Sequence, residues 1–208
     1  MQNYIWDLDG TLLDSYGAIV SSLVGVAAEQ HLTDAFPEIM NAVKRESVSA
    51  YLRSVSERSG TDLAVLYQRY RDISHSEART EEITLIPGAA ETLRILQDHG
   101  ARHFVYTHRG PSGFPILERL GVASFFTEIV TSVNGFRPKP SGEGITYLVE
   151  KYGLLKDDTA YVGDRSLDVY SAIDAGVKAV LFLPADSPVS ATGKEDLIIR
   201  KLSDLLRV

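Results

Sequence analysis

The sequence predicts an α/β fold, in which a Rossmann-like parallel sheet core is flanked by helices and carries an inserted all-α cap domain. Two observations lead to this prediction. From residue 87 onward, short apolar runs alternate with segments of helical periodicity, which is typical of βαβ units and a parallel sheet. A single apolar run at residues 4–6, with Leu8, is separated from the others by residues 15–78, which have only helical periodicity.

The expected elements of the core follow in chain order. The first strand is the apolar, aromatic run of residues 4–6, with Leu8, and it is expected to end near Asp7. Further strands are expected at residues 103–107, 128–131, 159–163 and 179–183. Helices are expected before and between them at residues 89–99, 115–120, 145–152 and 167–175. Residues 184–195, rich in Ser, Ala and Pro, are expected to form a loose segment.

The region between the first strand and the rest of the core predicts a small helical unit. Its apolar residues recur at helical spacing in four successive stripes, which begin near Tyr16, Phe36, Val48 and Leu63. Gly60 stands where the end of a helix is expected. We therefore predict an α/β core of residues 1–14 and 87–208 and an inserted helical cap of residues 15–86.

The composition excludes several classes of chemistry. The chain has 208 residues, with 21 basic and 28 acidic side chains and no cysteine. A disulfide scaffold, a thiolate zinc site, an iron–sulfur cluster and a cysteine nucleophile are therefore excluded. The net charge of −7 argues against a nucleic-acid partner, since phosphate backbones need clustered Lys and Arg. No signal peptide or membrane span is evident, so we expect a cytoplasmic protein with no membrane partner.

Two carboxylates follow the first predicted strand, in the pattern Asp7-x-Asp9 with Gly10 directly after it. Residues two apart in an extended segment point the same way, so Asp7 and Asp9 are expected to share a site. Paired carboxylates attract a hard divalent cation. An ordinary polar loop is the competing interpretation, whereas an EF-hand is excluded because the required Gly and Glu are missing.

Polar side chains also follow the other predicted strands. Thr107 ends the second strand, where a hydroxyl beside backbone N–H groups can hold a phosphate oxygen. Lys139 stands between two prolines that fix its direction after the third strand. Asp164 and Asp168 follow the fourth strand, with helix capping as the competing interpretation. Because ligands of open α/β sheets bind at the carboxyl ends of the strands, these residues are expected to form one site.

This combination of residues resembles the haloacid dehalogenase-like hydrolase superfamily, in its phosphoglycolate phosphatase-like and β-phosphoglucomutase-like subfamily with a helical cap. The residues that match the four motifs of the family are Asp7-x-Asp9-Gly10-Thr11, Thr107, Lys139 and Gly163-Asp164-x-x-x-Asp168. Residues 87–93 also resemble the helix start that follows the cap in this subfamily. The resemblance spans about residues 3–183.

The resemblance implies a Mg²⁺-dependent phosphatase that hydrolyses a small phosphorylated metabolite through an aspartyl-phosphate intermediate. Asp7 would be the nucleophile, and Asp9 would protonate the leaving oxygen and later activate water. Thr107 and Lys139 would complete the catalytic set. The residues that bind the substrate phosphate would be Asp7, Gly10, Thr107, His108 and Lys139. The metal ligands would be Asp7, Asp9 through its backbone carbonyl, Asp164 and Asp168. A monomer or a homodimer is expected.

Three alternatives stay open at this point. A phosphomutase of the β-phosphoglucomutase kind would use the same residues, and a haloacid dehalogenase would need neither the metal nor Asp9. A non-catalytic phosphate-binding regulator is expected to have lost one of Asp7, Asp9 or Lys139. The chain also departs from the family pattern at His108-Arg109 and at residues 141–144, which leaves the roles of His108 and Arg109 and the identity of the substrate open.

Overall fold

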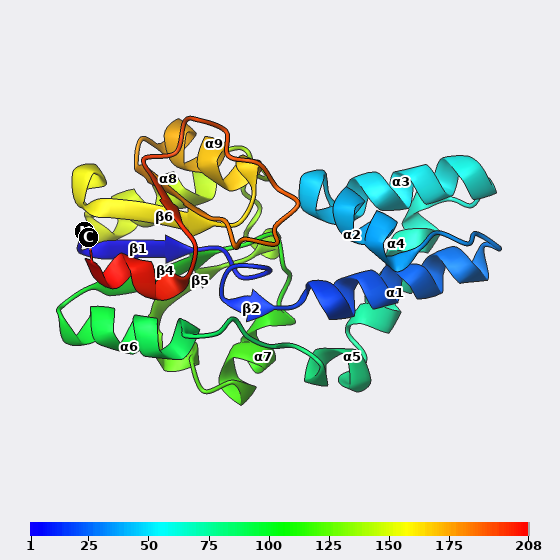
Figure 1. Ribbon diagram of the computed structural model, residues 1–208, viewed down its shortest axis with the longest axis horizontal. Coiled ribbons are helices and arrows are strands. Elements are labelled where there is room, and N and C mark those ends of the chain that lie inside the picture. The colour runs from blue at the N-terminus through cyan, green and yellow to red at the C-terminus, as the bar shows by residue number, and fades with distance from the viewer. Residues whose placement is uncertain (208) are drawn as a thin grey trace. The chain divides into compact units, whose positions relative to one another are not determined.

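A computed structural model describes residues 1–207, which divide into two compact units (Figure 1). One unit contains Met1–Asp14 and the chain from Leu85 onward, and the other is Ser15–Thr84. The second boundary lies two residues before the expected position, because Ile86 already belongs to the first unit, where its N–H donates to the carbonyl of Leu12 (2.9 Å).

The first unit is built on a six-stranded sheet in the order β5-β4-β1-β6-β7-β8, and every neighbouring pair is parallel. This confirms the predicted fold class. The strands are β1 (Asn3–Trp6), β4 (Arg102–Tyr106), β5 (Phe126–Val130), β6 (Thr159–Gly163), β7 (Lys178–Phe182) and β8 (Leu197–Ile199). The last strand was not expected, because three residues after a loose segment give no periodic signal. The central position of β1 brings the ends of β4 and β6 next to Asp7.

The helices of this unit begin and end within two residues of the predicted positions. They are α6 (Ala89–Asp98), α7 (Gly113–Arg119), α8 (Glu143–Tyr152) and α9 (Ser166–Ala175). Gly153 and Gly176, which follow α8 and α9, have positive φ values of 60° and 72°, a backbone conformation that glycine adopts without strain. Short 3₁₀ helices occupy Ala123–Phe125, Ser132–Asn134, Lys156–Asp158 and Leu202–Arg207.

The two faces of the sheet have different partners. Ile5, Phe104 and Tyr161 point from three adjacent strands into the core made with α8 and α9. In Figure 1 these two helices lie above β1, whereas α6 and the C-terminal 3₁₀ helix lie beneath it. Because side chains alternate along a strand, Asp7 continues the face of Ile5, so it points toward α8 and α9.

The second unit has a hydrophobic core of its own. Its helices are α1 (Tyr16–Glu29), α2 (Phe36–Arg45), α3 (Val48–Ser59), α4 (Leu63–Ser74) and α5 (Glu77–Glu81). Four of them follow the predicted stripes, and α3 ends at Gly60 with φ 75°. The short α5 was not expected, since it buries no residue and so has no apolar stripe. Two-residue strands flank this region at Leu13–Asp14 (β2) and Thr84–Leu85 (β3).

Three of the arginines in this helical unit have acidic partners within it. Arg58 forms an ion pair with Asp34 (2.6 Å), Arg69 forms one with Glu29 (2.6 Å), and Arg79 forms one with Glu82 (2.8 Å). Within residues 1–207, no helix is long and apolar enough to cross a membrane.

Candidate active site

Asp7 is placed by the strand pairing at the centre of the sheet. Its backbone N–H donates to the carbonyl of Val162 at 2.9 Å, so the pairing of β1 with β6 continues one residue beyond Trp6. The side chain is buried, with 1% of the residue exposed. A carboxylate in such a position is costly unless other groups balance its charge, which makes its surroundings informative.

The chain turns sharply directly after Asp7. The carbonyl of Leu8 accepts hydrogen bonds from the N–H groups of the residues at 11, 12 and 13, over 2.8–3.2 Å. Gly10 has φ 81° and donates its own N–H to the carbonyl of Leu13 (2.8 Å), so this donor is engaged in the turn. The turn holds Asp9 at the edge of the sheet, and the binding of phosphate by Gly10 stays a prediction.

Lys139 joins two carboxylates that are far apart in the sequence. Its ammonium lies 2.9 Å from Asp7 Oδ1 and 2.7 Å from Asp168 Oδ1, and none of its side chain is exposed. The same nitrogen lies 5.6 Å from the ring centre of Tyr106 and 5.3 Å from that of Tyr161. Burial lowers the pKa of Lys139, but the two carboxylates outweigh it and hold the pKa above the ordinary value, so the side chain is charged.

The close approach of Asp168 to the sheet depends on Gly163. A Cβ at Gly163 would lie 2.4 Å from the Cβ and the Cγ of Asp168, so only glycine leaves room for this carboxylate. Asp168 Oδ2 accepts the backbone N–H of Arg165 at 3.0 Å. Burial raises the pKa of Asp168, but the charges of Lys139 and Arg165 and their hydrogen bonds prevail and leave it below the usual value.

Three carboxylates converge at this edge of the sheet. Asp7, Asp164 and Asp168 each offer an oxygen, and these atoms all lie within 4.8 Å of one another. Asp7 Oδ2 is buried and, within residues 1–207, has no hydrogen-bond partner. Burial, opposed by Lys139, raises the pKa of Asp7. The two positive charges of Lys139 and Arg165 do not balance three carboxylates, so the oxygen set fits a hard divalent cation.

Thr107 and His108 connect the end of β4 with the loop that carries Lys139. The Thr107 hydroxyl accepts the N–H of Arg109 at 3.1 Å, and His108 Nε2 accepts the backbone N–H of Lys139 at 2.8 Å. Partial desolvation of the ring, and then the charges of Lys139 and Arg165, lower the pKa of His108 to about 4. A neutral His108 therefore orients the loop of Lys139, and its contact with phosphate stays a prediction.

Asp9 does not join the cluster of three carboxylates, because its side chain is paired with Arg109. The guanidinium Nε donates to both carboxylate oxygens at 3.0 and 3.1 Å, and Nη2 donates to Oδ1 at 2.5 Å. The predicted metal contact of Asp9 was through its backbone carbonyl, and that contact stays a prediction.

Sequence reasoning did not find Tyr106, Tyr161 and Arg165 as parts of this site. The Tyr161 hydroxyl donates to the carbonyl of Tyr106 (2.8 Å) and to Asp168 Oδ1 (3.3 Å). Strand alternation gave a usable signal for Tyr161, which shares a strand face with Gly163. Arg165 gave no signal, because the charge of a loop residue does not indicate where its side chain lies.

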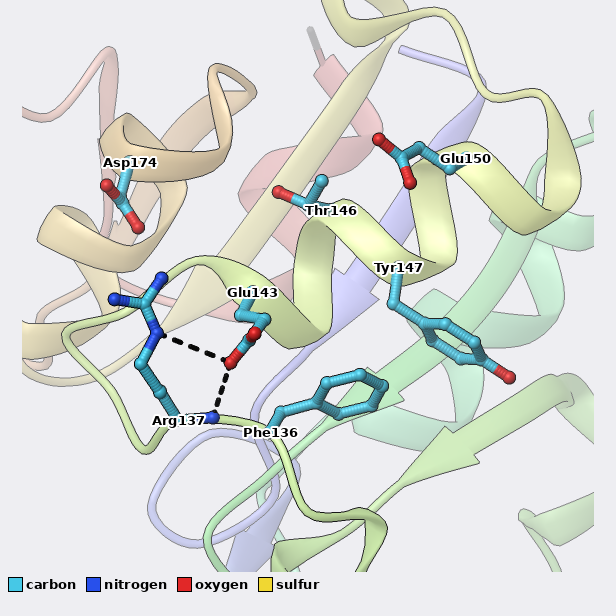
Figure 2. Close-up of a pocket in the computed structure, with 7 residues that line it drawn as sticks. All are labelled: Phe136, Arg137, Glu143, Thr146, Tyr147, Glu150 and Asp174. Atoms are coloured by element: carbon cyan, nitrogen blue, oxygen red, sulfur yellow. Dashed lines mark hydrogen bonds and ion pairs between the residues drawn. The ribbon is translucent and has the colours of Figure 1, made fainter.

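A separate hollow of about 370 Å³ lies along α8 (Figure 2). Figure 2 shows Arg137 beside Glu143, which accepts its backbone N–H (2.6 Å) and lies 3.5 Å from its guanidinium Nε. Phe136 and Tyr147 line another side, with ring centres 5.0 Å apart. None of the predicted catalytic or metal-binding residues lines this hollow.

A protein-family model described as haloacid dehalogenase-like hydrolase matches residues 4–182. The chain belongs to this family. It is 30% identical over 183 residues to the phosphoglycolate phosphatase of Agrobacterium fabrum (strain C58), a match that covers 85% of this chain and 78% of the relative. It is 25% identical over 215 residues to the pyrophosphatase PpaX of Bacillus velezensis, which covers 98% of this chain and 94% of the relative.

The structure agrees with this membership of the haloacid dehalogenase-like hydrolases. The crystal structure of a haloacid dehalogenase-like hydrolase from Bacteroides fragilis superposes with a TM-score of 0.85 at 20% identity, covering 98% of this chain and 99% of the other. The predicted family, fold class and hydrolase class are thereby confirmed. In this haloacid dehalogenase-like hydrolase, the four matched motifs all lie at one edge of the sheet.

Proposed function

We propose that this hydrolase is a Mg²⁺-dependent phosphatase that releases phosphate from a small phosphorylated metabolite by way of an aspartyl-phosphate. The observation that carries the proposal is the environment of the two carboxylate oxygens of Asp7. One of its oxygens is held by Lys139 at 2.9 Å, and the other is buried with no hydrogen-bond partner in the part of the chain that the structure describes. Such an oxygen fits a nucleophile or a metal ligand, whereas a purely structural carboxylate would be fully satisfied.

The proposed reaction has two steps, and Asp7 is the nucleophile. In the first, a carboxylate oxygen of Asp7 bonds to phosphorus while the bond from phosphorus to the leaving oxygen breaks, and Asp9 gives that oxygen a proton. In the second, water attacks the phosphorus of the aspartyl-phosphate and gives a proton back to Asp9. Phosphate leaves and the carboxylate of Asp7 is restored.

Lys139 and Thr107 would bind the phosphoryl oxygens in this scheme. Phosphoryl transfer needs mainly positioning and neutralisation of charge, and Lys139 is already charged and fixed beside Asp7. His108 would act indirectly, because its ring accepts the backbone N–H of Lys139 and so holds the loop in place. The helical unit Ser15–Thr84 would be the cap of the enzyme.

Asp7, Asp164 and Asp168 are the residues that would hold Mg²⁺, since their oxygens converge within 4.8 Å. The ion would supply the positive charge that lets an anionic phosphate approach an anionic nucleophile. Lys139 and Arg165 together still leave the three carboxylates with a net negative charge, which is the physical reason to propose a cofactor at this point.

The names of the relatives indicate the class of substrate. Those reported above are called a phosphoglycolate phosphatase and a pyrophosphatase. Both names refer to small molecules that carry a phosphoryl group, so we propose a small phosphorylated metabolite for this chain as well.

The test uses 4-nitrophenyl phosphate with Mg²⁺, because its hydrolysis needs no particular leaving-group pocket. The wild-type protein is expected to release phosphate, and Asp7→Asn is expected to abolish the release. Asp186→Asn, at an exposed aspartate in the 184–195 segment, is the matched control and should keep full activity. Full activity of Asp7→Asn would overturn the proposal. Incubation with a hexose 1-phosphate separates a phosphatase, which yields free phosphate, from a mutase, which yields an isomeric sugar phosphate.

A further inference from the structure

The guanidinium of Arg109 lies on the carboxylate that the proposed reaction needs. It contacts both oxygens of Asp9, with distances of 2.5–3.1 Å. The pair is largely shielded from water, since 8% of the Arg109 side chain and 20% of the Asp9 side chain are exposed. Charge-assisted hydrogen bonds are strong in such surroundings. In the proposed reaction the leaving oxygen approaches Asp9, so a cation stands directly beside the leaving group.

Arg109 is held in this position by its backbone as well as by Asp9. Its N–H donates to the hydroxyl of Thr107 (3.1 Å), and its carbonyl accepts the N–H of Ser132 (3.2 Å). The aliphatic part of the side chain passes over Gly113, where an added Cβ would lie 3.4 Å from the Arg109 Cδ. The guanidinium is therefore directed toward the edge of the sheet by its own loop.

The proposed reaction does not itself require this arginine. Lys139 and Thr107 suffice for the phosphoryl oxygens, and the pair between Arg109 and Asp9 engages the carboxylate that must face the leaving oxygen. A planar guanidinium binds carboxylate and phosphate oxygens with two parallel hydrogen bonds, which is the geometry it adopts with Asp9. A second oxyanion on the substrate would therefore compete with Asp9 for the same donors.

We infer that Arg109 is a specificity-determining residue that recognises a second anionic group on the leaving group of the substrate. The substrate class is then a phosphate ester or anhydride whose leaving group itself carries a carboxylate or phosphate. This inference rests on the proposed phosphatase function. An oxyanion of the leaving group binds the guanidinium and frees Asp9 to face the leaving oxygen, whereas a neutral leaving group leaves Arg109 on Asp9.

The test compares two classes of substrate in the presence of Mg²⁺. Pyrophosphate and 2-phosphoglycolate have anionic leaving groups, and glycerol 3-phosphate has a neutral one. For wild type and Arg109→Gln, kcat and KM are measured on each, and the ratio of kcat/KM between the classes is compared. We expect Arg109→Gln to lower this ratio about 10- to 100-fold, the loss typical of a charge-assisted hydrogen bond. Much of the loss should appear in KM.

Two further variants separate recognition from a structural effect. Arg109→Lys retains the charge without the fork and should restore part of the ratio. Arg94→Gln removes an exposed arginine that pairs with Asp98 on α6 and should leave the ratio within about twofold of wild type, as expected for a surface ion pair. If Arg109 had only a structural role, Arg109→Gln would lower kcat/KM for both substrate classes by the same factor. The ratio would then stay unchanged, and this result would overturn the inference.

The failure of this inference differs from the failure of the proposed function. An unchanged ratio in Arg109→Gln, with wild-type hydrolysis of 4-nitrophenyl phosphate that Asp7→Asn abolishes, rejects the role of Arg109 alone. Absence of phosphate release by the wild-type protein from all four compounds rejects the phosphatase proposal and this inference with it.

Discussion

Mild acid should destabilise the core of this protein through His103, a residue of β4 with none of its surface exposed. Both nitrogens of the ring are engaged. Trp6 Nε1 donates to His103 Nδ1 at 3.1 Å, so the proton of the neutral ring is on Nε2, which lies 3.0 Å from the carbonyl of Leu93. Protonation of Nδ1 would bring two donors together and bury a charge. Burial, opposed by the carbonyl of Leu93, accordingly lowers the pKa of His103 from 6.5 to about 4.

The sign and size of the effect follow from this pKa. Because the folded state has the lower pKa, the unfolded chain binds more protons between pH 6.5 and about 4, and stability falls as the pH falls through that range. Each unit of pKa difference corresponds to about 1.4 kcal/mol. His103 should therefore remove about 2 kcal/mol of unfolding free energy between pH 7.5 and 5, and about 3 kcal/mol by pH 4.

Trp6 is the only tryptophan and contacts the titrating ring, so its fluorescence reports directly on this region. Urea unfolding is followed by that fluorescence at pH 7.5, 6 and 5 for wild type and His103→Gln. The glutamine stays neutral and retains an acceptor and a donor. The unfolding free energy of His103→Gln should therefore fall less than that of wild type between pH 7.5 and 5, by about 2 kcal/mol. His99→Gln, at an exposed histidine, should behave like wild type. Equal pH dependence in wild type and His103→Gln would refute the reasoning.

Three other predictions concern the site. Gly163→Ala would place a methyl group 2.4 Å from Asp168, so thermal unfolding should show a loss of about 1–3 kcal/mol, with loss of phosphate release; an unaltered protein would contradict the close packing. Lys139→Met leaves Asp7 and Asp168 buried without their cation and should cost about 3–5 kcal/mol in urea unfolding, against at most about 1 kcal/mol for the exposed Lys151→Met. Excess EDTA should stop phosphate release and added Mg²⁺ should restore it, whereas turnover insensitive to EDTA would exclude the proposed cofactor.

The strands and helices that were predicted well are those with strong local signals. In residues 159–163 the run of apolar residues ends at a glycine, and the predicted strand has the same bounds as β6. The elements that were missed are short. In β8 three residues, and in α5 five residues, are too few to establish a period, so these elements depend on contacts that are distant in the sequence.

The same division holds for the site. Asp7, Asp164 and Asp168 were predicted to meet because each follows a parallel strand, and their oxygens do lie together. The pairing of Asp9 with Arg109 was not predicted, because the two residues are 100 positions apart and nothing local determines the partner of a long, flexible side chain. The rings of Tyr106 and Tyr161, which sequence reasoning did not assign to the site, face the ammonium of Lys139.

The sequence by itself determined the fold class, the family and the residues at the strand ends, because periodicity and motif spacing are local properties of the chain. Only the tertiary structure decided which charges lie against one another: Lys139 between Asp7 and Asp168, and Arg109 on Asp9. The physical reason is that an ion pair depends on distance and burial, and both are defined only after the strand order β5-β4-β1-β6 has brought distant loops to one edge of the sheet.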